Sequence, residues 1–172
     1  MIIQPELMAL RADDSPQRRI QRRLVAQSAA WRQTGQAAAI EAELPRLAGG
    51  APLAKLPALA ALFDPDGQAA DRLVAGVVNW LAEELAQEPL GQVPLRHQCD
   101  RTVATLVLAH CAGANLALQA IDGAGLALKP APKSASFAAN HYWERVLAGH
   151  AAVDQVQIIA RAPDRATLVC HG

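Results

Sequence analysis

Gly91-Gln92-Val93-Pro94 is the stretch at which the hydrophobic pattern of this chain changes. Before it, apolar residues recur at the three- and four-residue steps of an amphipathic helix. After it, β-branched and apolar residues follow one another with the alternation that is typical of strands. The change predicts an α+β fold, in which a helical region over residues 1–92 packs beside an antiparallel β region over residues 93–172.

The helical region contains several segments with recognisable ends. Ser15-Pro16 favours a helix start, because a serine oxygen can cap free amides and a proline in the first turn loses no hydrogen bond. Pro45 is expected to end the second helix, since proline interrupts the backbone hydrogen bonds of a helix interior. The helices are expected over residues 16–33, 36–44, 57–63 and 68–87.

The last of these helices carries the widest apolar stripe. Leu73, Val77 and Trp80 form one row on its surface, and Leu81 and Leu85 belong to a parallel row. A stripe of this width exceeds what one short neighbouring helix covers. We therefore expect it to be buried against the β region or in a homodimer interface.

The β region contains several short strands separated by turn residues. Residues 101–109 and 115–121 predict a hairpin around Cys111, and Asp122-Gly123 is a further turn signal. Because no helices intervene, the pattern predicts an antiparallel sheet, a sandwich or a small barrel. Further strands are expected over residues 126–128, 137–148, 155–161 and 166–170.

Residues 137–149, followed by the apolar run 156–160, resemble the closing strands of a cupin-type barrel. The resemblance spans about residues 95–170 and implies a small cupin-like barrel for the β region. Cupin enzymes hold a metal through two histidines one residue apart, a following glutamate and a later histidine. This chain departs from both motifs, so we expect no metal and no other cofactor.

The order of a helical half before a cupin-like half is also similar to one group of anti-sigma factors. Those proteins bind zinc through histidine and cysteine in the helical half, whereas the first such residues here are His97 and Cys99. His97 and Cys99 are one residue apart, while ligand pairs in structural zinc sites usually have two to four residues between them. The three cysteines, at irregular spacing, are expected to be reduced thiols.

Tyr142 and Trp143 are adjacent in a chain that has three Trp, one Tyr and two Phe. On a strand they point to opposite faces. The many alanines on the predicted strands leave room inside a barrel, so we expect a pocket with Trp143 or Tyr142 on its wall and His141 near its rim. The alternative places Trp143 in the core and Tyr142 at the surface.

Charge and composition restrict the partners. Sixteen Lys and Arg balance sixteen Asp and Glu, so no overall field attracts nucleic acid or an anionic membrane. The arginine-rich segment 18–23 is expected to be a solvated helix face paired with Glu83, Glu84 and Glu88. No stretch has the length of a membrane span, and no basic start precedes an apolar run, so a cytoplasmic protein is expected.

Together these patterns favour a non-catalytic binding or regulatory module that senses a small ligand or contacts a protein partner. A homodimer through the helical face is one form of such contact, and nucleic acid is not an expected partner. The alternative is a small metal-dependent cupin-type enzyme that uses His97, His110 or His141. A further alternative is a helical adaptor or anti-sigma-like regulator.

Overall fold

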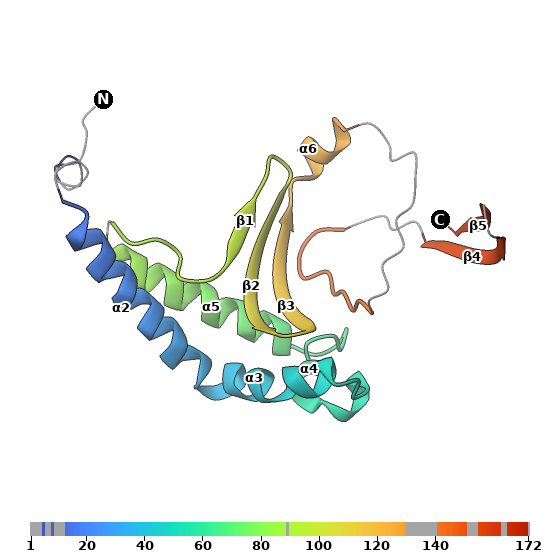
Figure 1. The fold of residues 1–172 in the computed structure, drawn as a ribbon, viewed down its shortest axis with the longest axis horizontal. Coiled ribbons are helices and arrows are strands. Elements are labelled where there is room, and N and C mark those ends of the chain that lie inside the picture. Colours follow the sequence, from blue (N-terminus) through green and yellow to red (C-terminus); the bar gives the residue numbers. More distant parts are fainter. Residues whose placement is uncertain are drawn as a thin grey trace. The chain divides into compact units, whose positions relative to one another are not determined.

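The computed structural model describes Pro5, Met8 and residues 13–88, 90–129, 141–150, 155–162 and 165–171. The chain divides into two compact units, Met1–Leu128 and Lys129–Gly172. The larger unit contains the principal helices and a three-stranded antiparallel sheet, and the smaller unit contains a two-stranded hairpin (Figure 1). The fold is α+β, as the sequence predicts. The change from helix to strand near residue 92 lies inside the larger unit.

The helices follow the predicted segments closely, with ends that differ by a few residues. Pro45 is the exception, because it lies inside the second helix instead of ending it. The last turn tolerates this proline because later amides still find carbonyl partners: Gly49 N donates to Pro45 O at 3.0 Å and Gly50 N to Leu47 O at 2.9 Å. The helices are α2 (Ser15–Arg32), α3 (Gly35–Ala48), α4 (Pro57–Ala60) and α5 (Ala69–Ala86), with a 3₁₀ turn at Leu53–Lys55.

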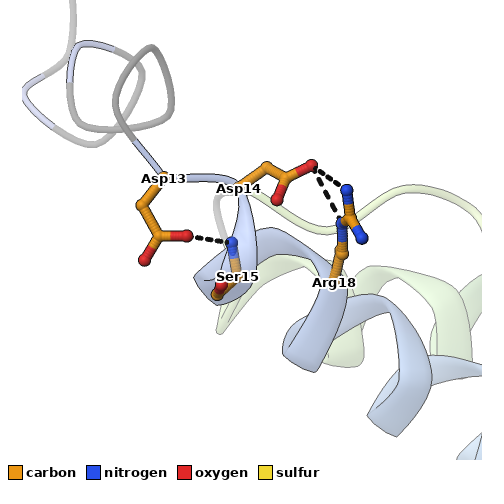
Figure 2. A network of polar contacts seen from close by, with 4 residues as sticks. All are labelled: Asp13, Asp14, Ser15 and Arg18. Carbon is orange, nitrogen blue, oxygen red and sulfur yellow. Dashed lines mark hydrogen bonds and ion pairs between the residues drawn. The ribbon is translucent and has the colours of Figure 1, made fainter.

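Acidic side chains, and not a serine cap, hold the start of α2 (Figure 2). Ser15 N donates to Asp13 Oδ1 at 2.9 Å. Arg18 donates to Asp14 Oδ2 from Nε at 2.9 Å and from Nη2 at 2.6 Å. Hydrogen bonding from the Ser15 side chain, and then from its backbone amide, lowers the pKa of Asp13 below the usual value for an aspartate.

Helices α2 and α5 run antiparallel, and both aromatic and charged side chains join these two parts of the chain. The rings of Trp31 and Trp80 stack with their centroids 5.7 Å apart. Arg23 Nη2 lies 2.7 Å from Glu88 Oε1 and 3.8 Å from Glu84 Oε2. The predicted pairing of the arginine-rich face with α5 is therefore confirmed for Arg23. Among the described residues, no helix is both long and apolar enough to cross a membrane.

The core of the larger unit lies between the helices and one face of the sheet. Leu73 and Val77 are buried, as the stripe on α5 predicts, while the three other members of that stripe, Trp80, Leu81 and Leu85, are partly exposed. Helix α3 contacts both β2 and β3 and so connects the helical layer to the sheet. The largest fully buried side chains are Leu24, Ile40, Leu44, Leu56, Leu59 and Val77.

The sheet consists of β1 (His97–Cys99), β2 (Val103–Cys111) and β3 (Ala114–Ile121), paired antiparallel in that order. The predicted hairpin is confirmed: Cys111 pairs with Ala114 across a two-residue turn. Gly113 in this turn has a φ of +93°, a conformation that favours glycine. The sheet is open, so a closed barrel is not what these strands form.

Two expected strands are not strands in the structure. Residues 126–128 were expected to be extended, but α6 (Gly123–Ala127) forms there instead, because Ala124 N donates to the Asp122 side chain and Leu126 N to the Asp122 carbonyl. Residues 141–148 of the expected strand 137–148 have no regular structure, and residues 137–140 lie outside the described residues. The remaining two expected strands are β4 (Gln155–Ala162) and β5 (Arg165–His171), which pair antiparallel.

Gly91 lies in the segment between α5 and the first strand, at a point where the chain packs closely against α2. A Cβ at this position would lie 2.8 Å from Leu24 Cδ1 and 3.0 Å from the Glu88 carbonyl oxygen. Leu24 is fully buried, so it has little room to yield. Next to it, Gln92 N donates to Gln21 Oε1 at 3.1 Å, and Gln21 Nε2 donates to Gln92 O at 3.4 Å. The chain is thus held against α2 before the strands begin.

We expect Gly91→Ala to lower the free energy of unfolding by about 1–3 kcal/mol, because the added methyl overpacks the contact with Leu24. Gly76→Ala is the matched control, since a Cβ at Gly76 in α5 meets nothing within 4 Å. The control should raise stability by about 0.5–1 kcal/mol through helix propensity. Urea denaturation of both variants measures the difference, and equal effects of the two would contradict the packing role of Gly91.

Glu43 is a buried side chain of α3 that gives a backbone amide of α4 its hydrogen-bond acceptor. Its Oε2 accepts a hydrogen bond of 2.9 Å from the backbone amide of Leu59 in α4. We expect Glu43→Ala to lower the free energy of unfolding by about 1–3 kcal/mol, because it leaves this buried amide without an acceptor. Glu43→Gln keeps an acceptor oxygen and should cost clearly less. If chemical denaturation shows the two variants equally destabilised, the negative charge and not the acceptor holds α4.

Candidate functional site

The three residues predicted to bind a ligand lie together in the smaller unit. His141, Tyr142 and Trp143 occupy the irregular segment 141–147, and all three are exposed, Tyr142 at 71% and Trp143 at 43%. The imidazole of His141 stacks on the Trp143 ring with centroids 6.1 Å apart. Their expected placement on a barrel strand is wrong, and so is the alternative of Trp143 as a core anchor. Their role as ligand contacts stays a prediction.

The larger unit contains a different polar cluster, whose geometry depends on a β-bulge in β2. The pairing of β2 with β3 shifts register between Val107 and Ala109, so that Leu108 is an extra residue. Leu108 and Ala109 are both buried, and both line a narrow gap with Ile40 of α3. In a bulge, an additional residue reverses the alternation that follows it. His110 consequently lies on the face of the sheet that points away from the helices.

Register identifies the other side chains of this outer face. Gln98 pairs with Thr105, Thr105 with Gln119, and His110 with Asn115. Val107 N donates to the Arg96 carbonyl at 2.8 Å, which extends the pairing of the first two strands by one residue. The outer face is formed by Arg96, Gln98, Val103, Thr105, Val107, His110, Asn115, Ala117, Gln119 and Ile121.

A hollow of about 440 Å³ lies over this part of the sheet, and we refer to it as the sheet hollow. His97 Nδ1 lies 2.9 Å from the Leu95 carbonyl oxygen. Because a carbonyl only accepts, Nδ1 carries the proton of this hydrogen bond, and in the neutral ring Nε2 is left as an acceptor. The residues that line the sheet hollow are Arg96, His97, Gln98, Thr105, Val107, His110 and Asn115.

The lining is rich in hydrogen-bond donors. The guanidinium of Arg96, the side-chain amides of Gln98 and Asn115, the Thr105 hydroxyl and the imidazole of His110 can all donate, and no carboxylate belongs to the lining. Arginine in particular offers a planar fork that matches a carboxylate or a phosphate. Side chains of this kind can donate several hydrogen bonds to a carboxylate or a phosphate.

The described residues do not form a metal centre. Among them, no group of three histidine, cysteine, aspartate or glutamate side chains is placed to hold a metal ion. His97 pairs with Leu106 and His110 pairs with Asn115. The two histidines therefore lie at different positions along the sheet and do not face each other. Cys99 and Cys111 are free thiols, as expected, while the side chains of Cys170 and His171 lie outside the described residues.

The sequence alone indicates His97 and His110 as candidate metal ligands, but it does not connect them with Arg96, Gln98 or Asn115. Strand alternation alone predicts that His110 points with Leu106 and Leu108, on the opposite face from Thr105. No residue pattern in β2 marks the bulge. Comparison of the chain with protein families, with curated proteins and with solved structures finds no match.

The exposure of Trp143 can be measured by fluorescence. In a variant in which Trp31 and Trp80 are both replaced by phenylalanine, we expect solvent-like emission from Trp143 that iodide quenches readily. Unfolding in urea should then shift this emission only slightly, because water already reaches the ring. A large red shift on unfolding would show that the indole is buried. The wild-type protein is the control, since its other two indoles stack and are only partly exposed.

Proposed function

We propose that the chain is a non-catalytic binding module that holds a small anion, a carboxylate or a phosphate, in the sheet hollow. The observation that supports this most directly is the lining: the guanidinium of Arg96, the imidazole of His110 and three uncharged polar side chains face the sheet hollow, and no acidic residue belongs to its lining. A volume of about 440 Å³ is within the range of small-molecule sites, which is about 300–1,000 Å³.

Binding without catalysis fits the exposure of these groups. Arg96, Gln98, His110 and Asn115 are exposed, and the sheet beneath them is a fixed hydrogen-bonded framework. General acid–base catalysis and transition-state stabilisation gain most from sites that exclude water, where electrostatic interactions are stronger. An open polar face supports reversible recognition instead, with the rigid strands keeping the donors in place.

The residues of the sheet have separate roles in this proposal. Arg96 supplies the positive charge and the bidentate hydrogen bonds. His110 and Asn115, which are cross-strand partners, donate from the hairpin end of the face. Thr105 lies on the central strand, on the same face as Arg96 and His110. Its hydroxyl also accepts a hydrogen bond from Gln119 Nε2 at 3.5 Å. Recognition of the anion requires Arg96 and His110 to lie on one face, which depends on the bulge.

The test is a titration with inorganic phosphate and, separately, with succinate, followed by amide NMR shifts. We expect shifts centred on residues 96–98, 105–110 and 115. Arg96→Gln should weaken binding about tenfold or more, since hydrogen bonds to charged groups contribute about 1.5–3 kcal/mol. Arg101→Gln is the matched control, because it makes the same change of charge at an exposed position outside the lining. Equal loss in both variants, or no localised shifts, would contradict an anion site.

A protein partner on the helical face is the second candidate. Val25 of α2 and Val78 of α5 are each 51% exposed, and Trp80, Leu81 and Leu85 of α5 are partly exposed. These exposed apolar side chains support the adaptor interpretation and the homodimer through the helical face that the sequence predicts. The metal-dependent enzyme has no support from the described residues, and metal analysis of purified protein tests it. The cupin-like relationship also stays a proposal.

A further inference from the structure

The two edges of the three-stranded sheet differ in how they are protected against pairing with another strand. The β1 edge is only three residues long and is flanked by Arg96, Asp100 and Arg101. The β3 edge is eight residues long, Ala-Asn-Leu-Ala-Leu-Gln-Ala-Ile, and contains no charge and no proline. Short strands, charges, prolines and bulges are the features that block edge-to-edge association. Strand β3 has none of them.

The backbone groups on the outer edge of β3 follow from the hydrogen bonds of β2. Val107 N donates to Arg96 O, so Val107 points its backbone groups toward β1. In an antiparallel ladder, neighbouring residues alternate between the two sides, so Leu106 and Ala104 point theirs toward β3. Asp122 N donates to Thr102 O at 2.8 Å, in agreement with this alternation. Leu118 and Ala120 are therefore the hydrogen-bonded partners of Leu106 and Ala104.

The intervening residues of β3 direct their backbone amides and carbonyls away from β2. Within the described part of the chain, the sheet ends at β3 and no other strand pairs with this edge. Ile121, one of the residues concerned, also keeps 58% of its surface exposed. The residues that present the edge are Asn115, Ala117, Gln119 and Ile121.

The outward-pointing residues of β3 match a second copy of themselves. If two β3 strands run antiparallel about a two-fold axis through Leu118, Ala117 lies opposite Gln119 of the second copy and Asn115 lies opposite its Ile121. Every outward-pointing residue then faces another one, which gives about eight interchain hydrogen bonds in the pattern of an antiparallel ladder. Shifting this register leaves outward-pointing residues unpaired at the strand ends.

Side chains are compatible with the same register on both faces. Leu118 would meet Leu118 of the second copy on the helix side, where Leu116 and Leu118 are only partly buried within one chain. On the outer face, the exposed Ile121 would lie beside Asn115. No like charges face each other, because β3 has no charged residue.

We propose that this chain forms a two-fold symmetric homodimer through the β3 edge, which joins two three-stranded sheets into one continuous six-stranded sheet. A second copy is the favoured occupant because two β3 strands match each other. In the antiparallel register described above, each outward-pointing residue faces another one, and no charge opposes the contact. The proposal is argued from the β3 edge and not from the anion site, but the two share Asn115, whose backbone lies at the edge and whose side chain lines the sheet hollow. The proposed dimer uses a different surface from the helical face.

Charge substitutions on the edge test this interface. In the proposed register, Ala117→Lys with Gln119→Lys places lysines opposite lysines, and Ala117→Glu with Gln119→Glu does the same with carboxylates. We expect the wild type to have twice the monomer mass by light scattering, each double variant to have the monomer mass, and a mixture of the two variants to recover the dimer. Gln98→Lys, an exposed change on the β1 side, is the control that should remain dimeric.

Disulfide trapping tests the register independently. In a background with Cys99, Cys111 and Cys170 changed to serine, Leu118→Cys should cross-link to itself on mild oxidation, because directly opposed residues in a non-hydrogen-bonded pair have Cα atoms about 4.5 Å apart. Gln98→Cys in the same background should not. A cross-linked dimer on non-reducing gels supports the proposal.

Three results would overturn the proposal: a monomeric wild type at high protein concentration, dimers that persist in both charged variants, or a charged pair that does not recover a dimer on mixing. Recovery on mixing also shows that the charged variants fold, so a loss of dimer cannot be attributed to misfolding. A monomer with β3 amides protected from hydrogen exchange would mean that another segment of the chain covers the edge.

Discussion

The extra residue in β2 is the constraint on which the larger unit depends. Leu108 and Ala109 both point into the core, where a regular strand would place only one of them. Together they form an apolar surface beside Ile40 of α3. The same insertion turns His110 away from the helices and places it with Thr105 and Asn115. One local irregularity thus completes the core on one face and the polar cluster on the other.

Among the described elements of the larger unit, helices cover only one face of the sheet, and this asymmetry shapes what the unit can do. Helix α3 packs on β2 and β3, so the opposite face keeps its polar side chains in water. A small open sheet also has two edges, and only the β1 edge is short enough to be protected by length alone. The proposed binding on the outer face and the proposed pairing along β3 both use strands that no other described element of the unit covers.

Contacts with the helical layer fix the position of the chain segment that leads into the sheet. Gly91 allows the chain to pass directly over Leu24, and the side chain of Gln21 holds Gln92 through two hydrogen bonds. Stacking of Trp31 on Trp80 and the ion pair between Arg23 and Glu88 fix α2 against α5 nearby. The point at which the sequence pattern changes is therefore also a point of tight tertiary packing.

Local pattern by itself determined the class of the fold. The helices α2 and α5, the hairpin of β2 and β3, and the existence of strands β4 and β5 all follow from periodicity and turn residues, because these signals act between near neighbours in the chain. Burial of Leu73 and Val77 was predictable for the same reason. Tertiary structure alone decided the bulge at Leu108, the open sheet and the irregular backbone around Trp143. The bulge and the open sheet depend on how the strands pair in space, which alternation along one strand does not show. A single extra residue decides which face His110 occupies.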